Sequence, residues 1–265
     1  MQQLRRLLGL ETETAPSLDT FTIAFPDDKT ALAVRLSRNA NPKAAVEALR
    51  LPHPRPVLVI MGGASDMNPE EMRTTRSSIE DGLSRFAEEH NVVIVDGGTT
   101  AGVMGLLGFS RHRRHYHFPL VGVAPEARVA YPGHNPPTRL GDLDPNHSHF
   151  ALVEGEDFGA ESNLLAGIGW AIADSGRETV LGVVINGGDI VRQEAHARAT
   201  GSLRFPLLVL DGSGRFADEL AAAYRAGTSS DPLLQDILKK GTIHALPANT
   251  SADNLRNWLE NFFGM

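Results

Sequence analysis

No cysteine occurs among the 265 residues, so the chain can form neither disulfide bonds nor thiolate-bound metal sites. Basic residues are in the minority, since 25 lysines and arginines face 32 aspartates and glutamates, for a net charge of −7. This balance argues against bulk binding to nucleic acid or to an anionic membrane, but it leaves room for a local basic pocket. No apolar run approaches the roughly 20 residues that span a bilayer, and the charged start MQQLRRLLGLETET is too poor in apolar residues for a signal peptide. We therefore expect a cytoplasmic protein that binds neither nucleic acid nor membrane.

Several catalytic motifs are also missing. The sequence contains no P-loop, no full G-x-G-x-x-G dinucleotide fingerprint and no G-x-S-x-G elbow of a serine hydrolase. His147 and His149 are spaced to face one side of a strand, but no carboxylate cluster adjoins them, so we expect no metal site. A histidine packed beside a ligand or hydrogen-bonded to a loop is the interpretation that we favour.

Apolar runs of strand length alternate with helical stretches from residue 57 onward. We expect strands at Val57–Met61, Val92–Val95, Leu120–Ala124, Phe150–Glu154, Val180–Ile185, Leu207–Leu210 and Thr242–Leu246. Continuous Val/Ile/Leu strands separated by helices are typical of a parallel sheet that helices cover on both faces. The pattern therefore predicts an α/β protein with a Rossmann-like, doubly wound parallel sheet, whose ligand lies at the carboxyl ends of the strands.

The first 50 residues follow a different pattern. Two strands, Thr20–Phe25 and Ala31–Leu36, flank the turn Pro26–Lys29, and a short helix follows from Asn41. This region has too little apolar content for a core of its own. We therefore predict one domain, with residues 1–50 as an N-terminal β extension packed on a main body of residues 51–265.

Four of the predicted strands end in turns built from glycine and other small residues. In a doubly wound sheet these turns share one edge, where backbone N–H groups and helix N-termini can bind an anion. Tight turns also need glycine for purely structural reasons, and Asp211 or Ser213 could be a plain helix cap. The predicted ligand-binding residues in these turns are Gly62, Gly63, Ala64, Gly97, Gly98, Thr99, Thr100, Gly102, Gly187, Gly188, Gly212, Ser213, Gly214 and Arg215.

Charged residues near the turns allow two interpretations each. The carboxylates around the end of the fourth strand, which are Glu154, Glu156, Asp157 and Glu161, could bind ribose hydroxyls or could favour the start of the next helix. We place the ribose near Glu154 or Asp218. The basic run 111–117 could be a phosphate clamp, a partner site or a solvated helix end, and the last is favoured.

The ordered set of turns resembles the SLOG superfamily of Rossmann-like nucleotide-ligand domains. It is most similar to the LSDAT branch, which occurs in prokaryotes and in the N-terminal cytoplasmic region of melastatin-type TRP cation channels. The stretches that carry the resemblance are Phe21–Phe25, Val59–Ala64, Val95–Met104, Val121–Pro125, Leu143–Val153 and Asp211–Asp218.

The resemblance implies a sensing domain for nucleotide-derived molecules, either ADP-ribose and related NAD products, which lead, or another nucleotide, with no cofactor required. It also implies that Arg139 contacts a phosphate and that the domain forms homo-oligomers, with the helix expected at Pro69–Phe86 as one candidate surface.

The resemblance also raises a catalytic alternative. Enzymes of the superfamily, the LOG-type phosphoribohydrolases, carry Pro-Gly-Gly-x-Gly-Thr followed by a catalytic glutamate. Here the corresponding stretch, Asp211–Arg215, lacks that proline and threonine, so Asp218 or Glu219 would have to replace the glutamate. Three hypotheses follow: a binding module, an N-glycosidic hydrolase, and an assembly scaffold whose cleft binds nothing.

Overall fold

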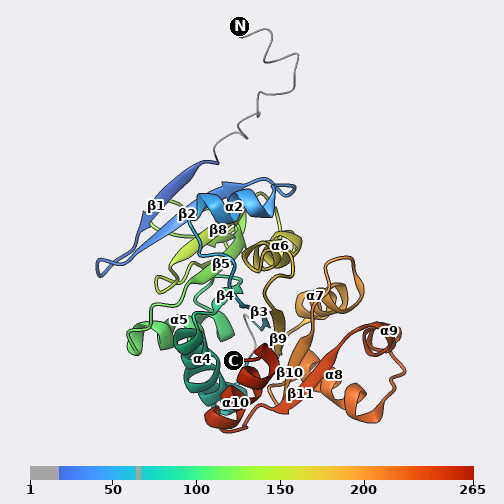
Figure 1. Cartoon of the computed structure of the whole chain (residues 1–265). Coiled ribbons are helices and arrows are strands. Elements are labelled where there is room, and N and C mark those ends of the chain that lie inside the picture. Colours follow the sequence, from blue (N-terminus) through green and yellow to red (C-terminus); the bar gives the residue numbers. More distant parts are fainter. Residues whose placement is uncertain (1–17, 64–66) are drawn as a thin grey trace, which may run out of the picture.

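The computed structural model describes residues 18–63 and 67–265, and its centre is a nine-stranded sheet (Figure 1). The strand order is β1-β2-β8-β5-β4-β3-β9-β10-β11, and every neighbouring pair is parallel except β1 with β2. The strands are β1 (Thr20–Ala24), β2 (Thr30–Leu36), β3 (Val57–Gly62), β4 (Val93–Asp96), β5 (Leu120–Pro125), β8 (His149–Val153), β9 (Val180–Ile185), β10 (Leu207–Asp211) and β11 (Ile243–Pro247).

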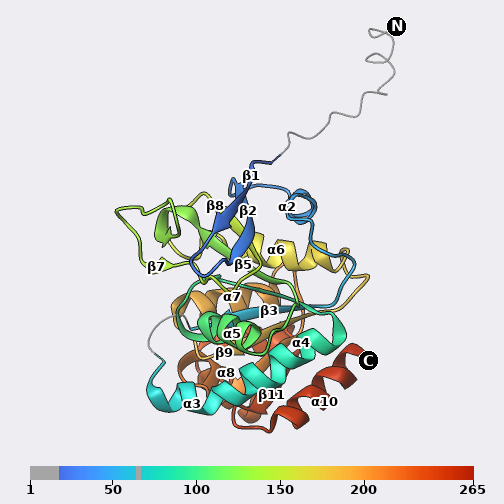
Figure 2. The ribbon, with the colours of Figure 1, turned by 90° about the vertical axis from the view of Figure 1, so that its left-hand side faces the viewer.

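Helices cover both faces of this sheet, which confirms the doubly wound Rossmann-like fold. One face carries α2 (Pro42–Ala48), α6 (Ser162–Ile172), α7 (Asp189–Thr200), α8 (Arg215–Ala226) and α9 (Pro232–Lys240). The other face carries α3 (Pro69–Ser77), η1 (Ser78–Leu83), α4 (Ser84–His90), α5 (Gly102–Arg113) and α10 (Ala252–Phe263), as Figure 2 shows. The central strands β3, β4, β5 and β9 are almost entirely buried because both of their faces lie under helices.

The chain reverses its direction of winding at β3. From β3 it runs outward through β4 and β5 to β8, and it then returns through α6 to place β9 on the other side of β3. The carboxyl ends of β3 and β9 therefore flank the topological switch point, the place where open α/β sheets bind their ligands. The turns at Gly62–Gly63 and Gly187–Gly188 lie at this point.

The N-terminal hairpin continues the central sheet. Strands β1 and β2 form where expected, and β2 pairs in parallel with β8, with Leu32 opposite His149 and Leu36 opposite Val153. A separate core cluster joins this hairpin to β5 and β8 and includes Ile23 and Phe150. The described part of the extension, residues 18–50, and the main body thus share one sheet within one domain.

The structure adds elements that the sequence pattern did not predict. Helix α9 forms between α8 and β11, and the connection from β5 to β8 contains a short 3-10 helix, η2 (Glu126–Arg128), and two paired strands, β6 (Val129–Ala130) and β7 (Gly141–Asp142). The long helix expected after β3 is interrupted by the π-helical turn η1, where α10 packs closely enough that a Cβ on Gly82 would lie 2.7 Å from Leu255 Cδ2. In the part of the chain that the structure describes, no helix combines the length and apolar character needed to cross a membrane.

Candidate functional site

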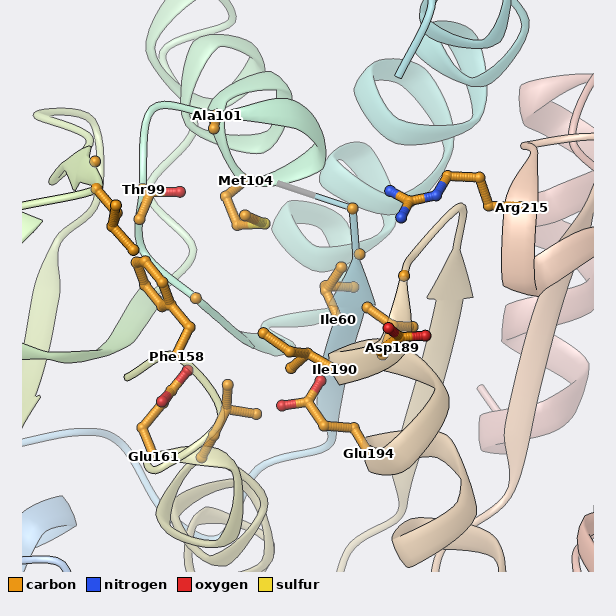
Figure 3. Close-up of a pocket in the computed structure, with 18 residues that line it drawn as sticks. Ile60, Thr99, Ala101, Met104, Phe158, Glu161, Asp189, Ile190, Glu194 and Arg215 are labelled. Atoms are coloured by element: carbon orange, nitrogen blue, oxygen red, sulfur yellow. The ribbon is translucent and has the colours of Figure 1, made fainter. Parts of the chain in front are cut away.

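A cavity of about 620 Å³ lies at the carboxyl ends of β3, β4 and β9 (Figure 3). Four helices, α5, α6, α7 and α8, begin around it, and the loop before β7 closes one side. The lining residues are Ile60, Gly62, Gly63, Gly97, Thr99, Ala101, Met104, Leu140, Gly141, Phe158, Glu161, Leu165, Gly188, Asp189, Ile190, Val191, Glu194 and Arg215. The cavity volume falls in the usual range for a site that takes a small organic ligand, about 300–1,000 Å³.

All four glycine turns meet at this edge of the sheet, but only part of each faces the cavity. The predicted ligand residues that line it are Gly62, Gly63, Gly97, Thr99, Gly188 and Arg215. The predicted residues that do not line it are Gly98, Thr100, Gly102, Arg139, Glu154, Gly187, Gly212, Ser213, Gly214 and Asp218. Ala64 lies outside the described residues.

The adjacent glycines Gly97 and Gly98 serve different purposes. Gly98 has a φ of +70°, and a Cβ on it would lie 2.7 Å from the Cα of Gly122 on β5, so the fold itself requires glycine there. A Cβ on Gly97 would meet only the terminal methyl of Met104, at the ordinary contact distance of 3.8 Å. Packing therefore does not require glycine at position 97, which lines the cavity.

A buried ionic network holds this turn from behind. The Oδ1 atom of Asp96 accepts the Gly98 N–H at 2.7 Å and a hydrogen bond from Nε2 of His147 at 2.9 Å. Nδ1 of His147 donates to Asp144 at 2.8 Å. Burial alone lowers the pKa of His147, but the two carboxylates outweigh burial and raise it to about 9. His147 is thus the histidine hydrogen-bonded to a loop, and its charged form donates from both ring nitrogens.

A second network joins the turns after β9 and β10. The buried side chain of Asn186 donates from Nδ2 to the Ser213 carbonyl at 2.8 Å and to Glu71 on α3 at 3.2 Å. The Ser213 hydroxyl accepts the backbone N–H of Asn186 at 2.8 Å and donates to the Leu210 carbonyl. Ser213 and the neighbouring Gly214, whose φ is +99°, therefore shape the loop rather than face the cavity.

The two candidate catalytic carboxylates on α8 have structural partners. One oxygen of Asp218 accepts the N–H groups of Gly212 at 2.7 Å and Gly214 at 3.1 Å, so it stabilises the turn before its own helix. Glu219 is exposed and forms an ion pair with Arg192 on α7, with an N–O distance of 2.6 Å. Neither side chain lines the cavity.

Arg139, Glu154 and the basic run lie away from the cavity. Arg139 lies by a separate, shallower hollow and forms an ion pair with Asp142 at 3.5 Å. Glu154 is exposed just after β8. Arg111, in the basic run at the opposite end of α5 from the cavity, donates to the carbonyls of Phe118 and Asn146 at 2.9 and 3.1 Å.

Two carboxyl groups in the cavity wall, those of Glu161 and Glu194, have raised pKa values. Glu161, of which 5% is exposed, precedes α6. Burial and the nearby Glu194 carboxylate raise its pKa to about 7, against the opposing effect of the backbone N–H groups of Glu161 itself and Gly159. Burial also raises the pKa of Glu194, although the Ser162 hydroxyl donates to it. The sequence pattern identified Glu161 as one of four carboxylates and missed Glu194. The sequence signal for Glu194 is its position four residues after Ile190, which places both side chains on the same face of α7.

Arg215 supplies positive charge on the opposite side of the cavity. It is the first residue of α8, and its guanidinium lies over Gly188, where a Cβ would come within 2.5 Å of Nη2. Figure 3 places Arg215 and Asp189 on one side and Thr99, Phe158 and Glu161 across the cavity from Arg215. Within the described ranges no group of three or more His, Asp or Glu residues is arranged to hold a metal ion.

The sequence from residue 55 to residue 256 matches the family model described as "SLOG in TRPM, prokaryote". The chain belongs to this family, as the resemblance predicted. Two curated relatives of this SLOG-family chain are the transient receptor potential cation channel trpm of Drosophila melanogaster and a transient receptor potential channel of Caenorhabditis elegans. The chain is 26% identical to the first over 238 residues and 26% identical to the second over 216 residues. These alignments cover 77% and 71% of this chain but only 12% and 10% of the relatives, so the chain spans about a tenth of their length.

Proposed function

We propose that this SLOG-family domain binds a nucleotide derivative that contains a diphosphate, with ADP-ribose or a related NAD product as the leading ligand. The ligand occupies the cavity at the switch point, and its binding serves as a signal. A homo-oligomer is a further expectation for this domain.

One observation supports the proposal most strongly. The helices that begin at the cavity, α5, α6, α7 and α8, have no side-chain hydrogen bond at their N-caps. The helices α2, α3, α9 and α10, which begin elsewhere, are capped by Asn41, Asn68, Asp231 and Ser251. An uncapped helix N-terminus leaves N–H groups and a positive dipole for an anion. The start of α7 fits this description best, because the first N–H groups of the other three helices already donate to backbone carbonyls: Val103 to Gly63, Ser162 to Gly159, and Phe216 and Ala217 to Gly187 and Asn186.

The distribution of charge in the cavity indicates how the ligand is oriented. The uncapped start of α7 lies beside Arg215 and the backbone of Gly188, which together suit phosphate oxygens, and Asp189 is the one carboxylate among the described lining residues on this side. The opposite side of the cavity carries Met104, Phe158 and Leu165, apolar side chains that suit the faces of a base or a sugar.

N-glycosidic hydrolysis is a second candidate because of one observation. The Glu161 pKa of about 7 matches the value that a general acid needs near neutral pH. In that case a carboxyl other than Asp218 or Glu219 would protonate the departing base.

A thermal-shift panel with ADP-ribose, cyclic ADP-ribose, NAD, AMP, ADP and ATP tests the proposal, followed by chromatography of each mixture. A ligand at a hundredfold excess over its dissociation constant adds about 2.7 kcal/mol of stability. Stabilisation with the ligand recovered intact would support binding, and release of free base would support hydrolysis instead. An unchanged melting temperature with every compound would contradict both and leave the scaffold hypothesis.

A further inference from the structure

The polar groups of the cavity are unevenly distributed. Arg215 and Asp189 lie on one side, whereas the Thr99 hydroxyl and the Glu161 carboxyl lie across the cavity from Arg215, among Met104 and Phe158 (Figure 3). A ligand that spans the cavity must therefore present different chemistry to the two sides.

Glu161 offers a fixed carboxyl at the start of α6. Its Oε2 atom accepts the backbone N–H of Gly159 at 2.8 Å, which holds the side chain in place. Figure 3 shows this carboxylate directed toward Phe158, on the side of the cavity away from Arg215. Its partner across the floor, Glu194, projects from α7 toward the cavity with Ser162 donating to one oxygen.

Thr99 provides an independent sign of a missing hydrogen-bond partner. The residue is 4% exposed and lines the cavity, yet its Oγ1 atom is buried and forms no hydrogen bond with any described residue. A buried hydroxyl without a partner costs about 1–3 kcal/mol. Figure 3 shows Oγ1 pointing toward the part of the cavity beside Met104, where a ligand hydroxyl or ring nitrogen could bond to it.

We propose that Thr99, Glu161 and Glu194 bind the hydroxyl groups of the ligand's sugar and reject a ligand that carries a phosphate on that sugar. The inference rests on the proposed function, because it specifies which nucleotides the same cavity accepts. It also moves the sugar-binding role from Glu154 and Asp218, which do not line the cavity, to the two glutamates that do.

The physical basis is the contrast between a hydroxyl and a phosphate. A carboxyl accepts a hydrogen bond from a hydroxyl when ionised and can also donate one when protonated. Once ionised, the two carboxylates cannot donate a hydrogen bond to a phosphate monoester, and two like charges brought close together in a poorly solvated cavity repel strongly. A site with two glutamates thus accepts a bare ribose and excludes a phosphorylated one.

Calorimetric titrations with ADP-ribose, its 2′-phosphate and its 1″-phosphate test this inference, because the extra phosphate lies on the adenosine ribose in one and on the terminal ribose in the other. The proteins are the wild-type chain, Glu161→Gln, Glu194→Gln, the double variant, Thr99→Val and the exposed control Glu154→Gln. For at least one phosphorylated form we expect an affinity at least about tenfold below that for ADP-ribose.

Each glutamine variant should reduce this ratio of the two affinities, and the double variant should bring the ratio below about threefold. Glu154→Gln should keep the wild-type ratio. Thr99→Val should weaken ADP-ribose itself.

Equal affinity for all three ligands in the wild-type chain would overturn the inference and leave the proposed function intact. The same conclusion would follow if the ratio persisted in the single glutamine variants, which keep the size of each side chain and serve if the double variant does not fold. A folded wild-type chain that binds none of the three ligands would instead contradict the proposed function, and the inference with it.

Discussion

His147 donates a hydrogen bond from Nε2 to Oδ1 of Asp96, with a separation of 2.9 Å, inside the core directly behind the cavity. The same carboxylate oxygen accepts the N–H of Gly98. The turn that presents Gly97 and Thr99 to the cavity therefore depends on a buried charge pair. This dependence links the stability of the fold to the geometry of the site.

The protonation of His147 should make stability depend on pH above neutrality. Because its pKa is raised from 6.5 to about 9, its contribution is complete below pH 6.5 and is lost as the pH rises through 9. The loss is on the order of 3 kcal/mol. Urea unfolding of the wild-type chain at pH 6, 7.5 and 9.5 should show this decline. The His147→Gln variant should be less stable, and its free energy of unfolding should vary less with pH over the same range.

His149→Gln is the control. Burial and Arg111 lower the pKa of His149 to about 4, so its titration changes the stability only at pH values below 6.5. A wild-type stability that stays constant from pH 6.5 to 9.5 would refute this role for His147.

Replacing Glu161 should stabilise the unliganded protein at alkaline pH. Its pKa is raised from 4.5 to about 7, so the native state loses stability relative to the unfolded state as the pH rises from 4.5 through 7. Glu161→Gln cannot ionise, so its free energy of unfolding at pH 8 should exceed that of the wild-type chain by on the order of 3 kcal/mol. The difference should vanish near pH 4.5, and the exposed Glu154→Gln should show no comparable change. A destabilised Glu161→Gln at pH 8 would contradict the assignment.

The glycines Gly97 and Gly98 should separate binding from folding. Gly97→Ala adds a methyl group that meets only Met104, so it should change the free energy of unfolding by less than about 1 kcal/mol. That methyl group lies where a ligand would approach the backbone, so affinity should fall about tenfold. Gly98→Ala places a side chain at a φ of +70° against Gly122 and should cost about 2 kcal/mol or more of stability. Urea unfolding and calorimetric titration of ADP-ribose measure both effects, and equal effects of the two substitutions on stability would be evidence against the distinction.

Arg215 should contribute to affinity through charge. A hydrogen bond from a guanidinium to a phosphate contributes about 1.5–3 kcal/mol, so Arg215→Gln should weaken ADP-ribose binding by about 10- to 100-fold. Higher ionic strength should weaken wild-type binding more than binding by the variant. Arg73→Gln serves as the control, because this exposed arginine on α3 pairs only loosely with Glu70, at 3.9 Å. If Arg215→Gln bound ADP-ribose with the wild-type affinity, Arg215 would not be a ligand-binding residue.

The sequence pattern predicted the fold well because the information was local and repeated. Strand-length runs such as Val180–Ile185 are apolar throughout, as strands buried on both faces must be, and the structure confirms them. The convergence of glycine turns at one edge follows from parallel pairing and also holds in the structure. Helix α9 was missed, although Asp231 and Pro232 are a regular helix start and the hydrogen bond from Leu233 N to Asp231 is present.

The individual residues of the site were harder to predict, because a turn shows which residues are close to the edge but not which way they point. Gly97 and Gly98 are adjacent, and only tertiary contact with Gly122 separates the glycine required by packing from the glycine that faces the cavity. Asp218 has a carboxylate, the group that binds ribose hydroxyls, but this carboxylate accepts the N–H of Gly212 in the turn before its own helix. Glu194 lies in the middle of α7 and reaches the cavity wall beside Ser162 of α6, a tertiary contact that no local pattern shows.

A calorimetric titration of ADP-ribose into the wild-type chain and Ile190→Trp tests whether the ligand binds in the cavity. Ile190 lines the cavity and is 43% exposed, so a larger side chain there should fill the cavity without disturbing the core. Ile190→Leu is the control of equal volume. We expect saturable binding by the wild-type chain and Ile190→Leu, and an affinity lower by at least about tenfold in a folded Ile190→Trp. Absence of binding to the wild-type chain, or undiminished binding to Ile190→Trp, would contradict binding in the cavity.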